Sequence, residues 1–168
     1  MTTDGPVLSI RPAGAEDEGF LWECLAMAAY EDSGAAARAV PYLMKWLEGW
    51  PRDGDFGVVA LKDDEPVGGT WARQFDMMDP HAALFVDERT PEIAIGVTEA
   101  ARGAGLGAQL LDALIAEGRA RNRNGLCLTV RSENPAVRLY LRKGFEFIPE
   151  AERINRVGGM SYGMLLRF

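Results

Sequence analysis

A strand, a glycine-rich turn and a long helix follow one another in the middle of the sequence, and this segment constrains the fold most. Residues 92–97 alternate apolar and polar positions, as a half-buried strand does. The turn is Arg102-Gly103-Ala104-Gly105-Leu106-Gly107, and residues 106–121 carry leucines at helical spacings of three and four. The first amides of a helix lack partners, and the helix dipole favours an anion beside them. With Arg102 adding a cation, the segment predicts a phosphate-binding site.

Glycine-rich turns have several functions, and the motif alone does not distinguish between them. It can simply connect a strand to a helix. Residues 103–108 also fit the dinucleotide pattern G-x-G-x-x-A. Five residues separate Val97 from Gly103, however, whereas that fingerprint directly follows its strand, and residues 121–125 lack the acidic residue expected about 20 positions on. A P-loop is excluded because no Gly-Lys-Ser/Thr follows the glycines.

The remaining periodicities predict one mixed α/β domain over residues 1–168, a length typical of a single domain. The predicted strands cover residues 7–11, 55–61, 66–75, 92–97, 126–130, 145–148 and 160–168. The predicted helices cover residues 20–30, 36–50, 106–121 and a short stretch that Asn134 caps, Pro135 begins and Gly144 ends. Residues 62–65 predict a hairpin turn, and residues 76–90 a long loop. The resulting order is β-α-α-β-β-β-α-β-α-β-β.

Composition narrows the classes of partner. The net charge is −7, from 25 acidic and 18 basic residues, which argues against non-specific binding to nucleic acid or an anionic membrane. The polar start and the lack of a long apolar stretch predict neither a signal peptide nor a membrane span. Cys24 and Cys127 both lie in apolar runs, which predicts buried, reduced thiols. We therefore expect a cytoplasmic protein.

Further motifs flank the glycine turn in a fixed order. They are Glu92-Ile93-Ala94-Ile95-Gly96-Val97 before it, and Leu128-Thr129-Val130, Asn134-Pro135-Ala136-Val137-Arg138-Leu139-Tyr140 and Lys143-Gly144-Phe145 after it. With these motifs, residues 92–147 resemble the acetyl-CoA-binding core of the GNAT superfamily of N-acetyltransferases. The rest of the chain fits the GNAT topology with little motif content. The resemblance implies a central, mostly antiparallel twisted sheet flanked by helices, with a CoA-binding core at about residues 92–148.

The resemblance also implies a set of cofactor-binding residues for acetyl-CoA and no metal. Backbone groups of Ile95, Gly96 and Val97 would pair with the pantetheine arm. The amides of residues 103–108 would hold the pyrophosphate, and Asn134 would contact the CoA arm near Tyr140. The full expected set is Ile95, Gly96, Val97, Arg102, Gly103, Ala104, Gly105, Leu106, Gly107, Ala108, Asn134, Ala136 and Tyr140.

Acetyl transfer to an amine needs a base, because alkylamines are protonated at neutral pH. Glu92 is the best base candidate, because it begins the strand that would carry the acetyl group and GNAT members often place a Glu there. It can also be read as a solvated carboxylate at a strand end. The Val97 amide is our candidate donor to the developing oxyanion. Tyr140 is a candidate acid for the leaving thiolate, although a tyrosine at this spacing also fits a core position.

Two other residues have side chains capable of acid–base or nucleophilic catalysis. His81, the only histidine, titrates near neutral pH, but it falls in the predicted loop 76–90. Cys127 could act as a nucleophile, but it stands in mid-strand between Leu126 and Leu128 with no histidine nearby in the sequence. We expect a surface role for His81 and core packing for Cys127.

The acceptor is the least constrained part of the prediction. Aromatic residues that could line a pocket for an apolar or cationic amine are Trp22, Tyr30, Tyr42, Trp46, Trp50, Trp71 and Phe75, although aromatics at such spacings usually belong to a core. The acidic residues Glu31, Asp32, Asp76 and Asp79 could attract a cation. The sequence therefore predicts transfer from acetyl-CoA to a primary amine of a small molecule or peptide, by direct attack in a ternary complex, with a homodimer as a possible assembly. The alternatives are a non-catalytic acyl-CoA-binding or regulatory module and a nucleotide-dependent oxidoreductase.

Overall fold

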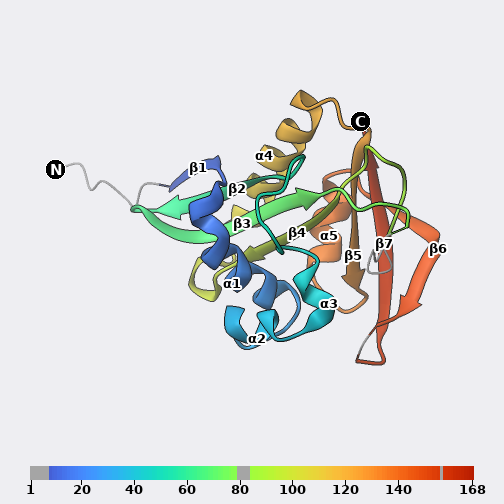
Figure 1. Ribbon diagram of the computed structural model, residues 1–168, viewed down its shortest axis with the longest axis horizontal. Coiled ribbons are helices and arrows are strands. Elements are labelled where there is room, and N and C mark those ends of the chain that lie inside the picture. The colour runs from blue at the N-terminus through green and yellow to red at the C-terminus, as the bar shows by residue number, and fades with distance from the viewer. Residues whose placement is uncertain (1–7, 79–83, 156) are drawn as a thin grey trace.

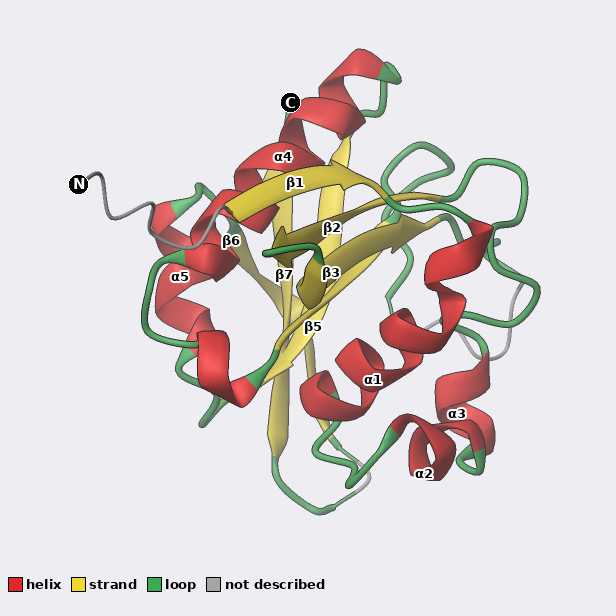
Figure 2. Ribbon diagram, turned by 90° about the vertical axis from the view of Figure 1, so that its left-hand side faces the viewer, coloured by secondary structure: helices red, strands yellow, loops and turns green. Residues whose placement is uncertain are grey.

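A twisted seven-stranded sheet forms the centre of the protein, with helices on both faces (Figures 1 and 2). The computed structural model describes residues 8–78, 84–155 and 157–168. Its strands are β1 (Leu8–Pro12), β2 (Phe56–Lys62), β3 (Glu65–Arg73), β4 (Glu92–Val97), β5 (Gly125–Arg131), β6 (Glu146–Ile154) and β7 (Met160–Arg167). Its α-helices are α1 (Glu18–Ala28), α2 (Gly34–Arg38), α3 (Pro41–Met44), α4 (Leu106–Ala120) and α5 (Ala136–Arg142), with short 3₁₀ turns at Ala15–Asp17 and Glu99–Ala101.

The strands lie in the order β1-β2-β3-β4-β5-β7-β6. Every neighbouring pair is antiparallel except β4 and β5, which are parallel. Over the described residues, β4 and β5 pair only at Glu92 and Cys127, near the start of β4. Beyond that point β4 stays paired with β3 through Val97, and β5 stays paired with β7 through Arg131. The two strands therefore diverge and leave an opening in the middle of the sheet.

Helices cover both faces of the sheet, as Figure 2 shows, and buried hydrophobic clusters lie beneath them on each face. On one face, Leu111 and Leu114 of α4 pack with Leu126 and Leu128 of β5 and with Phe145. The leucine stripe predicted for residues 106–121 is thus the buried face of α4. Burying one such leucine contributes about 1.5–3 kcal/mol, so this stripe fixes α4 firmly on the sheet.

On the opposite face, α1 packs against β4 at very short range. A Cβ atom on Gly96 would stand 2.4 Å from the Cys24 carbonyl oxygen of α1. Only glycine permits that approach. Leu21 and Leu25 of α1 then pack with Trp71 of β3 in the second core, so α1 and its neighbours form one wall beside the opening in the sheet.

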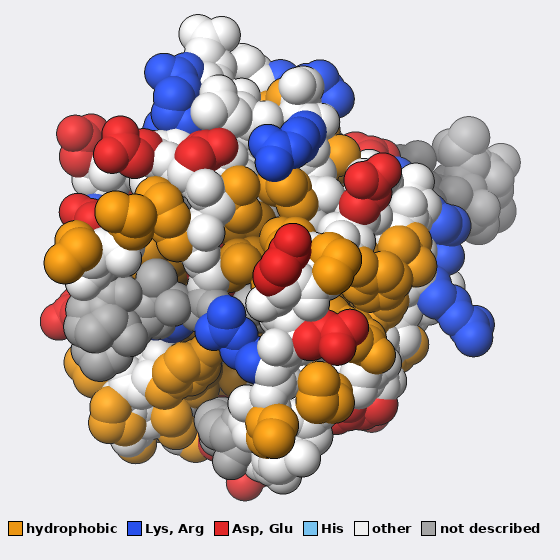
Figure 3. Space-filling view, turned by 90° about the vertical axis from the view of Figure 1, so that its right-hand side faces the viewer, with side chains coloured by type: hydrophobic (Ala, Val, Ile, Leu, Met, Phe, Trp, Pro, Cys, Tyr) orange, Lys and Arg blue, Asp and Glu red, His pale blue; other side chains and the backbone are white. Residues whose placement is uncertain are grey.

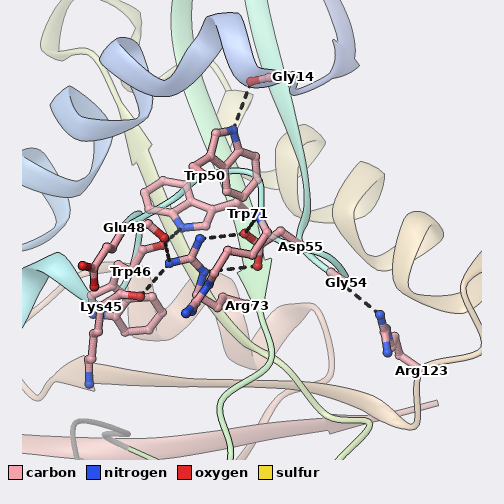
Figure 4. A network of polar contacts seen from close by, with 11 residues as sticks. Gly14, Lys45, Trp46, Glu48, Trp50, Gly54, Asp55, Trp71, Arg73 and Arg123 are labelled. Carbon is pink, nitrogen blue, oxygen red and sulfur yellow. Dashed lines mark hydrogen bonds and ion pairs between the residues drawn. The ribbon is translucent and has the colours of Figure 1, made fainter.

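The prediction of one helix over residues 36–50 is wrong. The chain forms two short helices, α2 and α3, followed by tight turns, because Pro41 has no amide to donate and begins α3 instead of continuing α2. Side chains of β3 bind the carbonyl groups that a longer helix would have used, as Figure 4 shows. Arg73 Nη1 donates to the carbonyls of Lys45 (2.8 Å) and Glu48 (3.0 Å), and Trp71 Nε1 donates to that of Trp46 (3.1 Å).

Arg73 is also part of a buried ion pair. Its Nε and Nη2 atoms donate to the two carboxylate oxygens of Asp55, at 3.1 and 2.6 Å (Figure 4). The side chains are 1% and 3% exposed. One arginine therefore fixes both ends of the segment between α3 and β2, at a position directly opposite Glu92 on β4.

Two smaller predictions need correction. Pro135 precedes α5 rather than beginning it, but Asn134 still caps the helix, since its Oδ1 accepts from the Ala136 amide at 2.9 Å. The strand predicted over residues 145–148 extends to Ile154, with a change of register between Ile148 and Arg153. Gly144, with a φ of 96°, ends α5 as predicted.

β6 forms one edge of the described sheet and carries exposed apolar side chains. Phe147 is 46% exposed and Ile154 is 74% exposed, and Val157 in the following turn is 61% exposed. Figure 3 shows this side of the molecule, where hydrophobic side chains gather in several patches between charged ones. The possible homodimer stays a prediction.

Candidate active site

A cleft of about 630 Å³ opens where β4 and β5 diverge. One wall consists of the edge of β4 from Ala94 to Val97, and the opposite wall consists of residues 129–131 of β5 and the start of α5. The end of α1 closes a third side. The remainder is lined by residues in and after α3 (Tyr42, Leu43 and Trp46), residues 153–155 of β6 and its turn, and Ser161 of β7. The predicted CoA-binding core and the predicted acceptor elements therefore meet in a single cleft.

The glycine turn lies at the start of α4. Gly103 and Gly105 have φ values of 85° and 77°, which explains why glycine occupies both positions, and no heavy atom lies within 4 Å of where either Cβ would stand. The first hydrogen bond into α4 runs from Gln109 N to Gly105 O. Within the described chain, the amides of residues 106–108 have no such bond and no side-chain cap. Open space and unpaired amides at the start of a fifteen-residue helix suit a phosphate group.

Backbone groups of β4 point into the cleft. Hydrogen-bonded and non-hydrogen-bonded pairs alternate along an antiparallel ladder, and the Thr98 amide donates to Val67 O at 2.9 Å. That register turns the amide and carbonyl groups of Ile95 and Val97 away from β3, toward the opening. Arg102 Nε donates to Val97 O at 3.0 Å, which is consistent with an outward-facing carbonyl.

The cleft contains most, but not all, of the predicted cofactor-binding residues. Those that line it are Ile95, Gly96, Val97, Arg102, Gly107, Asn134, Ala136 and Tyr140. Gly103, Ala104 and Gly105 are exposed beside it. The side chain of Leu106 belongs to the core under α4, so only its backbone faces the turn, and Ala108 is half-buried on the first turn of the helix.

Tyr140 combines core packing with access to the cleft. It is 7% exposed, and its ring packs edge-on against Phe145 with centroids 5.8 Å apart. Burial raises the pKa of its phenol above the ordinary value, and nearby Tyr30 adds to the rise. The phenol is therefore protonated throughout the neutral range and able to donate a proton.

Glu92 is a buried carboxyl, which excludes the alternative of a solvated strand end. It is 1% exposed and lies on the face of β4 that α1 covers, because side chains alternate and Gly96 contacts α1. The Leu84 amide donates to Oε1 at 3.2 Å, and Oε2 has no hydrogen-bond partner among the residues that the structure describes. Glu92 itself does not line the cleft, but Ala94 and Thr129 beside it do.

Burial raises the pKa of Glu92 from 4.5 to about 7, because the charged form loses its hydration. The positive charges of Lys45 and Arg153, the Leu84 amide and the nearby Thr129 hydroxyl oppose that rise. A carboxyl that titrates near 7 is suited to accept a proton and return it under neutral conditions.

The aromatic residues divide between pocket and core. Tyr30, Tyr42 and Trp46 line the cleft, whereas Trp22, Trp50, Trp71 and Phe75 are core residues outside it. The Lys45 ammonium lies over the rings of Tyr42, Trp46 and Phe75, at 4.4, 5.4 and 5.4 Å from their centroids. The burial of Lys45 among these rings was not predicted from the sequence, which indicated one continuous helix over residues 36–50.

Other candidates lie away from the cleft. Cys127 is fully buried, and burial raises the pKa of its thiol well above the ordinary value, so it is a core residue as expected. Glu31, Asp32 and Asp76 do not line the cleft, while His81 and Asp79 lie outside the described residues. No group of three or more potential metal ligands occurs within residues 8–78, 84–155 and 157–168. In the same ranges, no helix is both long and apolar enough to cross a bilayer.

Comparisons with known proteins agree with this geometry. The model of the acetyltransferase (GNAT) family matches residues 48–145, which is more than half of the chain. No curated protein sequence matches. Among solved structures, the ribosomal-protein-alanine N-acetyltransferase from Brucella melitensis is similar, with a TM-score of 0.67 and 25% identity over 95% of this chain and 99% of that one.

Two further structures share the fold. An N-acetyltransferase from Staphylococcus aureus Mu50 has a TM-score of 0.70 and 22% identity, covering 96% of this chain and 98% of its own. The yncA protein of Salmonella typhimurium, whose structure contains its cofactor acetyl-CoA, has a TM-score of 0.71 and 22% identity, covering 96% and 94%. The predicted fold, a mostly antiparallel sheet flanked by helices, is confirmed. The chain belongs to the GNAT family of acetyltransferases, and acetyl-CoA is its acetyl donor.

Proposed function

We propose that this protein transfers the acetyl group of acetyl-CoA to a primary amine, by direct attack within a ternary complex, as a single domain. The observation that carries the proposal is the divergence of β4 and β5. It brings the unpaired amides at the start of α4 to the same cleft as the edge of β4, and it places Glu92, with a pKa of about 7, at the point where the opening begins.

The donor half of the cleft fits acetyl-CoA. The amides of residues 103–108 and the Arg102 guanidinium would bind the pyrophosphate. The outward-facing amides and carbonyls of Ile95 and Val97 would pair with the pantetheine arm, with Asn134 and Ala136 on the opposite wall. Acetyl-CoA supplies the thioester whose carbonyl carbon the amine attacks.

The remaining chemistry falls to three groups of this chain. Glu92 would accept the proton of the incoming ammonium through a water molecule, since it lies behind the cleft wall. The Val97 amide, which points into the opening, would donate to the carbonyl oxygen as negative charge develops there. Tyr140 would donate its phenol proton to the sulfur as the C–S bond breaks, and would recover a proton from solvent.

The first test is ligand binding, measured by calorimetric titration with acetyl-CoA, CoA, NAD and ATP. Acetyl-CoA and CoA should bind in the micromolar range, and NAD and ATP should not. If neither acetyl-CoA nor CoA binds at high micromolar concentration, the proposal is wrong. The oxidoreductase alternative would require NAD to bind instead.

The second test separates an enzyme from a non-catalytic acyl-CoA-binding module of the same fold. Acetyl-CoA is incubated with an amine library, and free thiol release is followed for wild type and Tyr140→Phe. An enzyme releases thiol only with certain amines, and the variant should lose about 10²-fold or more in kcat while CoA affinity is kept. A module binds CoA equally well in both proteins and releases no thiol with any amine.

A further inference from the structure

Two arginines from distant parts of the chain come together through strand register. Arg131 on β5 lies directly opposite Ser161 on β7, and Ser161 lies directly opposite Arg153 on β6. Directly paired residues on neighbouring strands point to the same face of a sheet. All three residues line the cleft, so Arg131, Ser161 and Arg153 form a polar row across three strands on its floor.

This row lies on the acceptor side of the sheet. The neighbouring β5 residues Leu128 and Val130 belong to the core under α4 and α5, so the alternation of side chains turns Arg131 to the opposite face. The Arg131 guanidinium carbon lies 4.5 Å from the ring centroid of Tyr30, just after α1. The row therefore faces the side of the sheet that α1 covers, whereas the glycine turn begins α4 on the other side.

The row is positively charged, although the whole chain has a net charge of −7. The described residues that line the cleft include Arg102, Arg131 and Arg153 but no aspartate or glutamate. In the described part of the chain, neither Arg131 nor Arg153 forms a salt bridge. Ser161 Oγ accepts from Asn155 Nδ2 at 3.3 Å, and among the described residues its hydroxyl proton has no acceptor, so it can donate to a ligand. Guanidinium groups that form no salt bridge among the described residues, beside a hydroxyl, suit an oxyanion.

We propose that the acceptor is a small amine that also carries an oxyanion group, such as the carboxylate of a free amino acid, and that Arg131 and Arg153 bind this group. The proposal rests on the function proposed above. The oxyanion would lie on the Arg131–Ser161–Arg153 row, and the amine would face the edge of β4 that lines the cleft. Tyr30, Tyr42 and Trp46 would contact the apolar part of the acceptor.

The experiment compares amines that differ only in a carboxylate, using leucine against isoamylamine and phenylalanine against phenethylamine. Wild type should show a kcat/KM at least about tenfold higher for the amino acid of each pair. In the double variant R131Q/R153Q this preference should disappear, mainly through KM of the amino acid, with the decarboxylated amine unaffected. Because the same pair is measured in both proteins, the intrinsic reactivity of each amine cancels. Arg142→Gln, an exposed arginine outside the cleft, is the matched control and should keep the preference.

Several results would overturn the proposal. One is an equal or higher kcat/KM for the decarboxylated amines in wild type, which would leave the proposed N-acetyl transfer intact. Another is a rise in KM for acetyl-CoA rather than for the amino acid in R131Q/R153Q. That result would show that the two arginines bind acetyl-CoA and not the acceptor.

A binding measurement tests the row without turnover. CoA-loaded protein is titrated with N-acetyl-leucine and with N-isoamylacetamide. Tighter binding of the carboxylate in wild type, lost in R131Q/R153Q, supports the row even if no amine is acetylated and the proposed function fails. Equal binding of the two compounds in wild type contradicts it.

Discussion

The proposed donor half and the proposed acceptor half of the cleft are built in different ways. The donor half consists of β4, the glycine turn, α4 and α5, and its key groups are backbone amides that short motifs position locally. The acceptor half combines the end of α1, the segment of α3 and the β5, β6 and β7 strands, and its key groups are side chains brought together over long distances in sequence. A cofactor site of this kind can be encoded by a contiguous motif, whereas substrate choice depends on how separate elements dock.

Glu92→Gln should separate the two halves most clearly, because it should lower kcat strongly and leave CoA binding unchanged. This change removes the proposed base without removing the buried side chain, so kcat should fall by about 10²–10⁴-fold. The affinity for CoA should stay within about twofold of wild type, because Glu92 does not line the cleft. Steady-state kinetics and calorimetry on the same preparation check both values. A variant that keeps wild-type kcat would show that Glu92 is not the base.

Arg73→Met should weaken the acceptor half by loosening the segment between α3 and β2. It leaves Asp55 buried without its partner and frees the carbonyls of Lys45 and Glu48, so we expect a loss of about 3–5 kcal/mol in the free energy of unfolding. Urea denaturation measures the loss. The matched control is Arg121→Met, which breaks an exposed pair with Glu117 and should cost less than about 1 kcal/mol. Equal losses in the two variants would contradict the anchoring role.

Glu92 should also link stability to pH. Its pKa is about 7 in the folded protein and ordinarily 4.5, so the folded state holds the proton more tightly. The free energy of unfolding should therefore decrease as pH rises from 4.5 to 7 and level off above 7, by about 1–3 kcal/mol from this group. In Glu92→Gln this contribution should be missing, so the variant should be more stable than wild type at pH 8. An identical pH dependence in the two proteins would refute the assignment.

Gly105→Ala should affect only the donor half. The alanine must adopt a φ of 77°, which strains the turn by about 1 kcal/mol and should weaken CoA binding by about fivefold to tenfold. The KM of the acceptor should not change. Gly19→Ala is the control, since that position lies in α1 with open space around it and without a positive φ. Equal effects at the two positions would contradict a specific role for the turn.

The features that the sequence predicts belong mainly to the proposed donor half, and those that it does not predict belong mainly to the proposed acceptor half. The stripe of α4, the strand β4 and the glycine turn were predictable because their periodicity and motif are local. Pro41 is a local signal against one continuous helix, whereas the turns after α3 were not predictable, because there Arg73 and Trp71 from another part of the chain bind the carbonyls that helical hydrogen bonds would otherwise use. The proposed role of Arg131 and Arg153 was not predictable either, because only the register through Ser161 makes them neighbours.

Two properties of Glu92, its burial and its raised pKa, could not be predicted from the motif that contains it. Its position at the start of β4 follows from the sequence, but its burial beneath α1 and its raised pKa follow only from packing. For Tyr140, the sequence left a core position and an acid role as alternatives; in the fold the side chain packs in the core and also lines the cleft, and the acid role stays a prediction.

The pH profile of kcat/KM for amine acetylation tests the central claim most directly. Wild type should show a rise with an apparent pKa near 7, the value for Glu92 and well below that of an alkylamine. In Glu92→Gln the small residual rate should lack this step and rise only as the amine itself loses its proton. A step near 7 that persists in Glu92→Gln, or a wild-type profile that follows only the amine, would contradict the assignment of Glu92 as the base of this cleft.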